Sequence, residues 1–210
     1  MAGDPTAWAD RFRLFDSQFL ERVVAVWSRC RALLPSKPDE DTITANLVDL
    51  LHRDPDIWRR FQWIEFHYEP FGHTPGGTAF SRGIVDIAVF LDQDRDRYLA
   101  YECKRLNERR DDGRRSLATR YVMDGLSRFI TGQYSENLPV GCMLGYVLDG
   151  DVKYAALSVR AKIVDRGEDV ALIAEPLDDI AIGEATRFCS CHRRGSKGAE
   201  IEVRHALLPM

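Results

Sequence analysis

The sequence lacks the features that would place it among membrane-spanning, disulfide-stapled or nucleotide-loop proteins. No apolar run approaches the ~20 residues that a membrane span requires. The five cysteines are odd in number and show no Cys-x-x-Cys spacing, which argues against a disulfide framework and a four-ligand zinc site. Gly-x-x-x-x-Gly-Lys, Gly-x-Gly-x-x-Gly and Gly-x-Ser-x-Gly are all missing. The beginning of the chain has no basic-then-apolar leader, so a cytoplasmic protein is expected.

What is present is typical of one globular domain. The 210 residues are 45% hydrophobic and 30% charged, which allows a sizeable core. The order of predicted elements indicates an α/β fold, a mixed central β-sheet flanked by helices. Residues 1–34 would form an N-terminal helical extension, and residues 35–210 the α/β core. The formal charge of −4 argues against binding nucleic acid through total charge alone.

Two apolar, β-rich runs dominate the middle of the chain, at residues 83–91 and 97–104. They are joined by Asp92-Gln93-Asp94-Arg95-Asp96, which predicts a hairpin with a charged tip. Each strand carries charge among apolar neighbours, namely Asp86 on the first and Glu102 and Lys104 on the second. Charged residues are seldom buried without a partner or a metal.

Strand alternation puts Glu102 and Lys104 on one face of the second strand. With the loop centred near residue 94, Asp86 lies opposite Glu102, with Cβ atoms about 5 Å apart. Two carboxylates at that distance repel each other unless a cation lies between them. The pattern therefore indicates a metal site assisted by Lys104. The alternative is a solvated hairpin in which these residues form surface ion pairs.

An Asp on one strand followed by Glu-x-Lys on the next resembles the PD-(D/E)xK nuclease superfamily, which includes many restriction endonucleases. Val85 stands where the motif has proline. The resemblance implies a restriction endonuclease-like core in which Asp86 and Glu102 bind Mg²⁺, with Mn²⁺ able to substitute. It implies that Lys104 positions the attacking water and stabilises charge on the phosphate.

The same resemblance suggests further site residues. The family often adds an acidic residue from a preceding helix, for which Glu40 is the candidate, and a polar residue from the following helix, for which Gln133 fits. The backbone carbonyl of Cys103 is a further candidate oxygen ligand. Acids are favoured in the first turn of any helix, so Glu40 also has a purely structural explanation.

A basic segment follows the predicted catalytic strand. Residues 103–120 hold seven basic side chains against three acidic ones. The segment is either a solvated loop or a phosphate-contacting element, because local charge steers a polyanion more than total charge does. The candidate substrate-binding residues are Arg105, Arg109, Arg110, Arg114, Arg115 and Arg120.

The remaining pattern predicts the elements around this hairpin. Ser36 and Asp39 resemble a capping box before a helix that carries Glu40. Residues 71–78 read as a Gly- and Pro-rich loop. Helices are predicted over 6–34, 116–134 and 153–165, and strands over 61–68, 141–148, 170–174, 186–192 and 200–207, the last two as a hairpin.

These observations predict a Mg²⁺-dependent endonuclease that hydrolyses phosphodiester bonds of nucleic acid, with DNA the expected substrate. A restriction or phage-defence role is implied by the family alone. The modest charge suggests that a partner subunit or homodimerisation supplies additional contacts for binding the substrate. Two alternatives stay open: a catalytically idle nuclease-like fold acting as an interaction or regulatory subunit, and an unrelated α/β protein with a structural ion pair.

Overall fold

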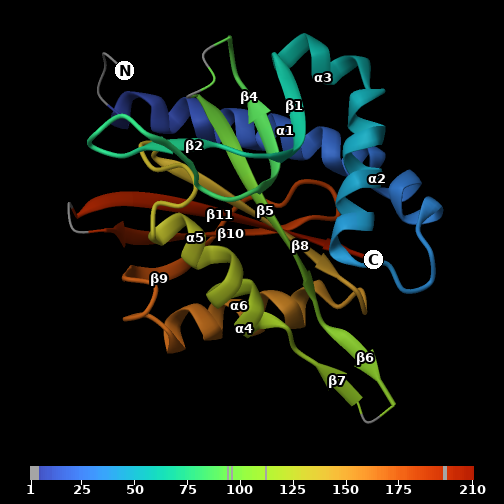
Figure 1. Cartoon of the computed structure of the whole chain (residues 1–210). Helices are drawn as coiled ribbons and strands as arrows, with labels where there is room; N and C mark the ends of the chain where they lie inside the picture. The colour runs from blue at the N-terminus through green and yellow to red at the C-terminus, as the bar shows by residue number, and fades with distance from the viewer. Residues whose placement is uncertain (1–4, 94, 96, 112, 196–197) are drawn as a thin grey trace.

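A mixed seven-stranded sheet forms the centre of the molecule (Figure 1), in the order β1-β4-β5-β8-β11-β10-β9. The computed structural model describes residues 5–93, 95, 97–111, 113–195 and 198–210, without the side chains of residues 5–7 and Arg110. β5 pairs in parallel with β8, and β8 with β11, whereas the other neighbours are antiparallel. The strands of this sheet are β1 (Trp63–Tyr68), β4 (Val85–Phe90), β5 (Tyr98–Leu106), β8 (Val140–Val147), β9 (Leu172–Asp178), β10 (Thr186–Arg194) and β11 (Ala199–Pro209).

Helices cover both faces of the sheet. Trp27 of α1 stacks on Tyr146 of β8, and Thr44 of α2 hydrogen-bonds the Tyr146 hydroxyl, so these two helices share one face. Phe129 of α5 packs against Gly141 of β8 from the other face, where α6 also lies (Figure 1). Among the described residues, no helix is both long and apolar enough to cross a bilayer. The helices are α1 (Pro5–Leu33), α2 (Glu40–His52), α3 (Pro55–Arg60), α4 (Ala118–Arg120), the π-helix η1 (Tyr121–Leu126), α5 (Ser127–Ile130) and α6 (Val152–Asp165).

The α/β class with a helix-flanked mixed sheet is therefore confirmed, and so is the central hairpin. β4 and β5 pair antiparallel from Phe90 opposite Tyr98 to Ile87 opposite Tyr101, and beyond this pair Asp86 accepts a hydrogen bond from the Cys103 amide. Asp94 and Asp96 of the predicted tip lie outside the described residues. All eight residues of β8 are buried, as expected for a central strand between parallel neighbours.

Several local predictions were wrong. The predicted loop at 71–78 begins as β2 (Phe71–His73), which pairs with β3 (Ala79–Ser81). The basic segment is a second hairpin, β6 (Glu108–Arg110) with β7 (Gly113–Arg115), that projects from the body in Figure 1. Asp39, not Ser36, caps α2 by accepting a hydrogen bond from the Thr42 amide. The helix predicted over 116–134 ends at Ile130 and contains the π-helical turn η1.

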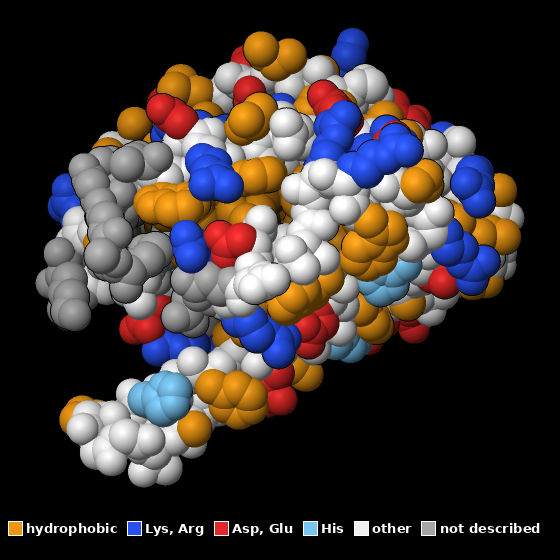
Figure 2. All heavy atoms as spheres, turned by 90° about the horizontal axis from the view of Figure 1, so that it is seen from above, with side chains coloured by type: hydrophobic (Ala, Val, Ile, Leu, Met, Phe, Trp, Pro, Cys, Tyr) orange, Lys and Arg blue, Asp and Glu red, His pale blue; other side chains and the backbone are white. Residues whose placement is uncertain are grey.

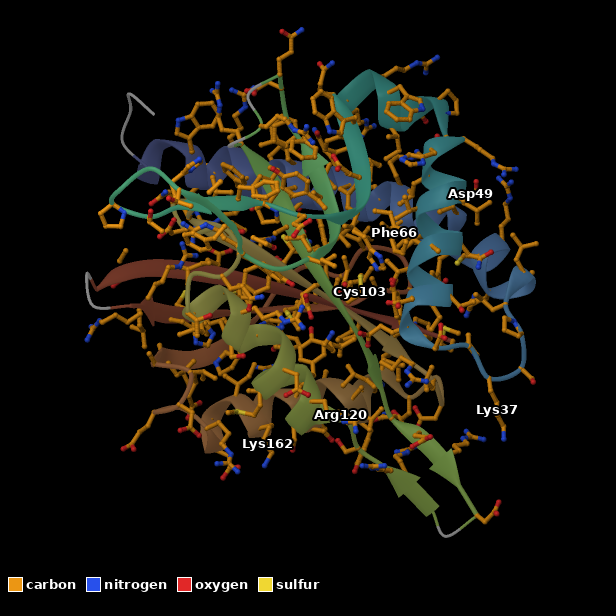
Figure 3. All side chains as sticks on the ribbon, in the orientation of Figure 1. Lys37, Asp49, Phe66, Cys103, Arg120 and Lys162 are labelled. Atoms are coloured by element: carbon orange, nitrogen blue, oxygen red, sulfur yellow. The ribbon has the colours of Figure 1, made fainter. Side chains whose placement is uncertain are left out.

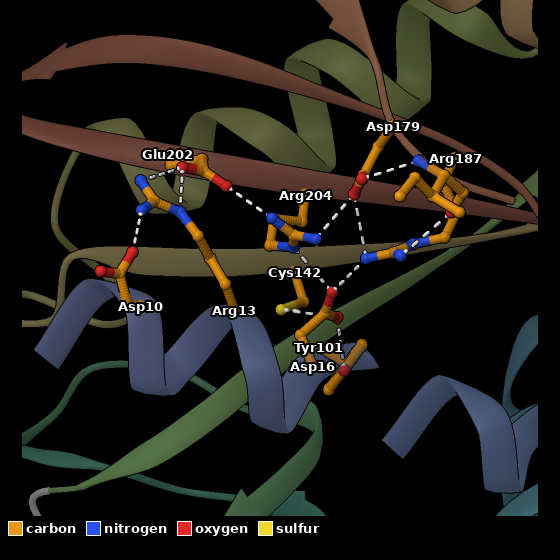
Figure 4. Close-up of polar contacts among 10 residues, drawn as sticks. Asp10, Arg13, Asp16, Tyr101, Cys142, Asp179, Arg187, Glu202 and Arg204 are labelled. Atoms are coloured by element: carbon orange, nitrogen blue, oxygen red, sulfur yellow. Dashed lines mark hydrogen bonds and ion pairs between the residues drawn. The ribbon is translucent and has the colours of Figure 1, made fainter. Parts of the chain in front are cut away.

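A buried ionic cluster fixes α1 to the sheet (Figure 4). Asp16 of α1 is 1% exposed, and its Oδ2 accepts hydrogen bonds from Arg187 and Arg204, both at 2.7 Å. Its Oδ1 accepts from the Tyr101 hydroxyl at 2.7 Å. Asp179 pairs with the same two arginines from the opposite side. Because both guanidinium groups are desolvated, the cluster depends on its carboxylates to compensate that cost.

We expect Asp16→Ala to lower the free energy of unfolding by about 3–5 kcal/mol, because it leaves buried cations short of a partner. Asp10→Ala is the matched control, since Asp10 pairs with Arg13 on the same helix but is 91% exposed. The control should cost less than about 0.5 kcal/mol. Urea denaturation measures both values, and equal effects would contradict the account of the cluster.

A second buried polar chain connects η1 to β10 and β11. His192 Nδ1 donates to the Val170 carbonyl, so its Nε2 must accept from the Ser190 hydroxyl in the neutral ring. Ser190 Oγ then accepts from His205 Nε2–H, which leaves His205 Nδ1 to accept from the Tyr121 hydroxyl. The Val170 carbonyl, at one end of the chain, therefore sets the direction of every hydrogen bond in it. The chain holds Tyr121, the first residue of η1, against the sheet.

Both histidines must stay neutral for this chain to persist. Burial lowers the pKa of His192 from 6.5 to about 4, and burial also lowers the pKa of His205 well below its ordinary value. The unfolded chain therefore binds more protons below pH 6.5, and stability falls as the pH drops from 6.5 towards 4. His192 alone should remove about 1 to 2 kcal/mol between pH 6.5 and pH 5. Denaturation of the wild type and His192→Asn at both pH values checks this, and an unchanged pH dependence in the variant would contradict it.

Candidate active site

Glu40 and Lys104 line a cleft of about 500 Å³ between α2 and the α4–η1–α5 segment, whereas Glu102 is buried against Lys104, with Asp86 as its electrostatic neighbour. Glu102 and Lys104 come from the middle of β5, Asp86 from the start of β4, and Glu40 from the first turn of α2. Cys103, labelled in Figure 3, lies between α2 and the segment that carries Arg120. Three separate elements are thus needed to assemble the cluster.

Glu102 is the most deeply buried member, with a side chain that is 0% exposed. Its Oε1 lies 2.7 Å from Lys104 Nζ, and its Oε2 lies 3.1 Å from Arg128 Nη1. Burial and the neighbouring Asp86 raise the pKa of Glu102 to about 7. Oε1 meets no hydrogen-bond geometry within the described part of the chain, but the Lys104 ammonium occupies its side at 2.7 Å. A metal would bind this oxygen only by displacing the ammonium.

Lys104 lies at the centre of three oxygen atoms. Its Nζ is 2.7 Å from Glu102 Oε1, 2.8 Å from Glu40 Oε1 and 2.9 Å from the Cys103 carbonyl oxygen. Burial lowers the pKa of Lys104, but the two carboxylates raise it more, so that its pKa lies above the ordinary value. The side chain is consequently an ammonium cation at neutral pH.

Asp86 and Glu40 are each held by a backbone amide of β5. The Cys103 N–H donates to Asp86 Oδ2 at 2.6 Å, and the Arg105 N–H donates to Glu40 Oε2 at 2.9 Å. Burial raises the pKa of Asp86, while Lys104 opposes that shift. Both oxygens of Glu40 are therefore engaged, one by the strand and one by Lys104. This arrangement suits Glu40 better to orienting Lys104 than to binding a metal directly.

Sequence reasoning missed Arg128 and Tyr134. Arg128 donates to the Tyr134 hydroxyl at 2.5 Å, and that hydroxyl in turn donates to the Ile84 carbonyl. The available signal was a single arginine within the apolar end of the predicted helix. Gln133, the predicted polar residue, lies beyond the end of α5 and packs so closely on Gly83 that a β-carbon there would collide with it.

The candidate substrate-binding arginines divide into two groups. Arg105 and Arg120 line the cleft. Arg109, Arg114 and Arg115 lie on the β6–β7 hairpin, where Arg114 pairs with Asp149 and Asp151 and is thereby partly neutralised. The side chain of Arg110 lies outside the described residues.

The π-helical turn brings the helix backbone onto the site. A β-carbon at Gly125 would lie 3.3 Å from Lys104 Cγ and 3.5 Å from Glu102 Cγ. The nearest atom to such a β-carbon would be Met143 Cε at 2.7 Å, so a larger residue at 125 would have to displace the Met143 side chain and press on Lys104. π-helical turns occur frequently at functional sites, where they re-aim side chains. Here the turn is followed within two residues by Arg128, which faces Glu102.

The donor set fits a hard divalent cation. Mg²⁺ is commonly held by one or two carboxylates together with water and substrate phosphate. Asp86, Glu102 and the Cys103 carbonyl supply oxygen donors of that kind, and Glu102 Oε1 lacks a hydrogen bond. Among the described residues, however, no three His, Cys, Asp or Glu side chains are grouped closely enough to form an all-protein cage.

No protein-family model matches the chain, and no curated protein or solved structure matches it either. A function for the protein must therefore be inferred from the geometry of the cleft.

We expect Arg128→Met to raise the pKa of Glu102 above about 7, because it removes a cation 3.1 Å from Oε2. Arg120→Met is the matched control, since Arg120 lines the same cleft but is exposed to solvent. A pH titration of the ¹³C carboxyl resonance of Glu102 measures the shift. The same pKa in both variants would contradict the contact between Arg128 and Glu102.

Proposed function

We propose that the protein is a metal-dependent nuclease of the PD-(D/E)xK type that hydrolyses phosphodiester bonds, with DNA as its substrate and Mg²⁺ as its cofactor. The observation that carries this proposal is the convergence of Asp86, Glu102 and Lys104 from two neighbouring strands. Asp86 is close enough to Glu102 to raise its pKa, and Lys104, which lines the cleft, is an ammonium 2.7 Å from Glu102 Oε1. The mixed sheet flanked by helices agrees with the core that the sequence motif implies.

The charges of the cluster support a divalent cation and a phosphate together. Asp86, Glu102 and Glu40 in their ionised forms carry three negative charges, and Lys104 and Arg128 two positive ones. The cluster alone is therefore negative by one. A divalent cation and one phosphodiester group add one positive charge between them, so that these five side chains with both ligands sum to zero, before the three acidic and two basic side chains that also line the cleft are counted. This balance suits binding of a metal and a nucleic acid in the same cleft.

Each residue then has a role that its contacts allow. Asp86, Glu102 and the Cys103 carbonyl would hold Mg²⁺, which supplies a water of lowered pKa and offsets charge on the phosphate. Lys104 is protonated, so it donates hydrogen bonds and orients the attacking water instead of accepting a proton. Glu40 keeps Lys104 in place. Arg128, partly exposed at the cleft, contributes a guanidinium group that can donate to the phosphate oxygens.

One observation favours a second candidate, a catalytically idle nuclease-like fold that serves as an interaction or regulatory subunit. Lys104 Nζ already contacts Glu102, Glu40 and the Cys103 carbonyl, and so neutralises the oxygens that a metal would use. In the active protein a metal must compete with this ammonium. In the idle fold the ion pairs are permanent. Metal dependence separates the two candidates.

The direct test is cleavage of supercoiled plasmid DNA, single-stranded DNA and RNA with Mg²⁺, with Mn²⁺ and with EDTA. We expect DNA cleavage that requires the metal and that falls by at least about a hundredfold in Asp86→Asn and in Lys104→Met. Asp124→Asn, an exposed carboxylate on the same cleft, is the matched control and should retain activity. Full activity of the Asp86 variant would rule out the site, and metal-independent cleavage would rule out the mechanism.

A further inference from the structure

A second hollow, which we call the aromatic groove, has a volume of about 600 Å³ and lining residues distinct from those of the cleft. The β2–β3 hairpin forms one wall, and the turn at residues 135–138 forms the other. Tyr68 at the end of β1 and Tyr98 at the start of β5 lie between them. Figure 2 shows the hairpin projecting from the body with hydrophobic and histidine side chains along it.

Aromatic rings are unusually accessible here. Phe71 lines the groove and is 62% exposed, and Phe80 on the facing strand of the hairpin is 44% exposed. Tyr68 and Tyr98 form an edge-to-face pair with centroids 5.3 Å apart. Exposed large rings on a projecting hairpin add nothing to the core of this protein. Nucleobases stack on such rings with little regard to sequence.

Two guanidinium groups accompany the rings. Arg95 lies 5.5 Å over the ring of Tyr68 and is paired with Glu65, yet its side chain is 55% exposed. Arg82 pairs with Glu136 and donates to the Gly132 carbonyl. Arginine beside accessible aromatic rings is the combination that binds a phosphate and its base together.

The turn at residues 135–138, which forms the wall opposite the hairpin, is held by hydrogen bonds from the sheet. Arg194 of β10 donates to the carbonyls of Ser135 and Glu136, both at 2.5 Å. Ser135 has φ +53°, in the left-handed region, and its buried hydroxyl finds no hydrogen-bond partner in the described ranges of the chain. A strained residue with an unsatisfied polar group persists only where its surroundings fix it, and such residues concentrate at binding sites.

The groove and the cleft have no lining residue in common, but neighbouring residues connect them. Tyr134, next to Ser135 of the groove, contacts Arg128 of the cleft and the Ile84 carbonyl. Arg82 of the groove precedes Asp86 by four residues along the chain. A nucleic-acid strand seated in the groove would therefore lie against segments that lead to the candidate site.

We propose that the aromatic groove holds an unpaired nucleotide of the substrate, so that the substrate carries a single-stranded segment beside the bond to be cleaved. This inference deepens the proposed nuclease function and rests on it. Phe71 and Tyr68 would stack the base, and Arg95 would bind the adjoining phosphate. A blunt duplex, in which every base is paired, offers the groove no base to stack.

The test measures binding without catalysis, by fluorescence anisotropy of a labelled 12-nucleotide single strand and a blunt duplex in EDTA. The wild type should bind the single strand more tightly. Phe71→Ala should weaken that binding by about tenfold. Arg95→Gln should weaken it and reduce the magnitude of the salt-dependence slope by about 0.7. Leu157→Ala, an apolar residue of α6 that is 69% exposed, is the control and should bind like the wild type.

Tighter binding of the duplex, or equal binding by Phe71→Ala and the wild type, would overturn the inference. Cleavage of duplex DNA that depends on Asp86 while Phe71→Ala binds normally would leave the nuclease function standing and the groove proposal refuted. Single-strand binding that depends on Phe71, in a protein without metal-dependent cleavage, would support the groove as a binding site and refute the nuclease.

Discussion

The burial of the Glu102 carboxylate is the constraint around which the molecule is organised. A carboxylate at 0% exposure in the middle of a sheet is costly unless cations compensate it. Lys104 comes from the same strand, but Arg128 reaches Glu102 only because η1 and α5 lie against the sheet. Gly125 allows that close approach, and the hydrogen-bond chain from Tyr121 to Val170 holds the beginning of η1. The packing of η1 and α5 on this face of the sheet thus helps to compensate the buried charge of Glu102.

The pairing at this centre could be predicted from the sequence because it depends on local rules. Strand alternation and a hairpin of known centre are enough to put Asp86 opposite Glu102. The contact of Glu40 with Lys104 could be predicted only in part, since the helix dipole explains an acidic residue at that position equally well. The role of Arg128 could not be predicted from the sequence. The direction of its side chain depends on a π-helical turn, which alters the helical periodicity that the prediction used. The β2–β3 and β6–β7 hairpins were missed because strands of three residues leave no periodic pattern.

In the proposal, the cleft and the aromatic groove bind different parts of the substrate. The cleft carries charges of both signs, which would suit a metal and a phosphate, whereas the aromatic groove carries accessible rings, which would suit a base. The segment at 132–138 connects them, because Tyr134 contacts Arg128, which lines the cleft, and Ser135 lines the groove. Local features of this kind would allow a chain with a net charge of −4 to bind a polyanion.

The central claim is that Asp86 and Glu102 form a divalent cation site from which a metal displaces the Lys104 ammonium. Crystals of the protein soaked in Mn²⁺, analysed by anomalous scattering, test this most directly. We expect one anomalous peak within about 2.3 Å of both carboxylates, with Lys104 Nζ moved away from Glu102 Oε1. No peak between the two carboxylates, with Lys104 still paired to Glu102, would contradict it.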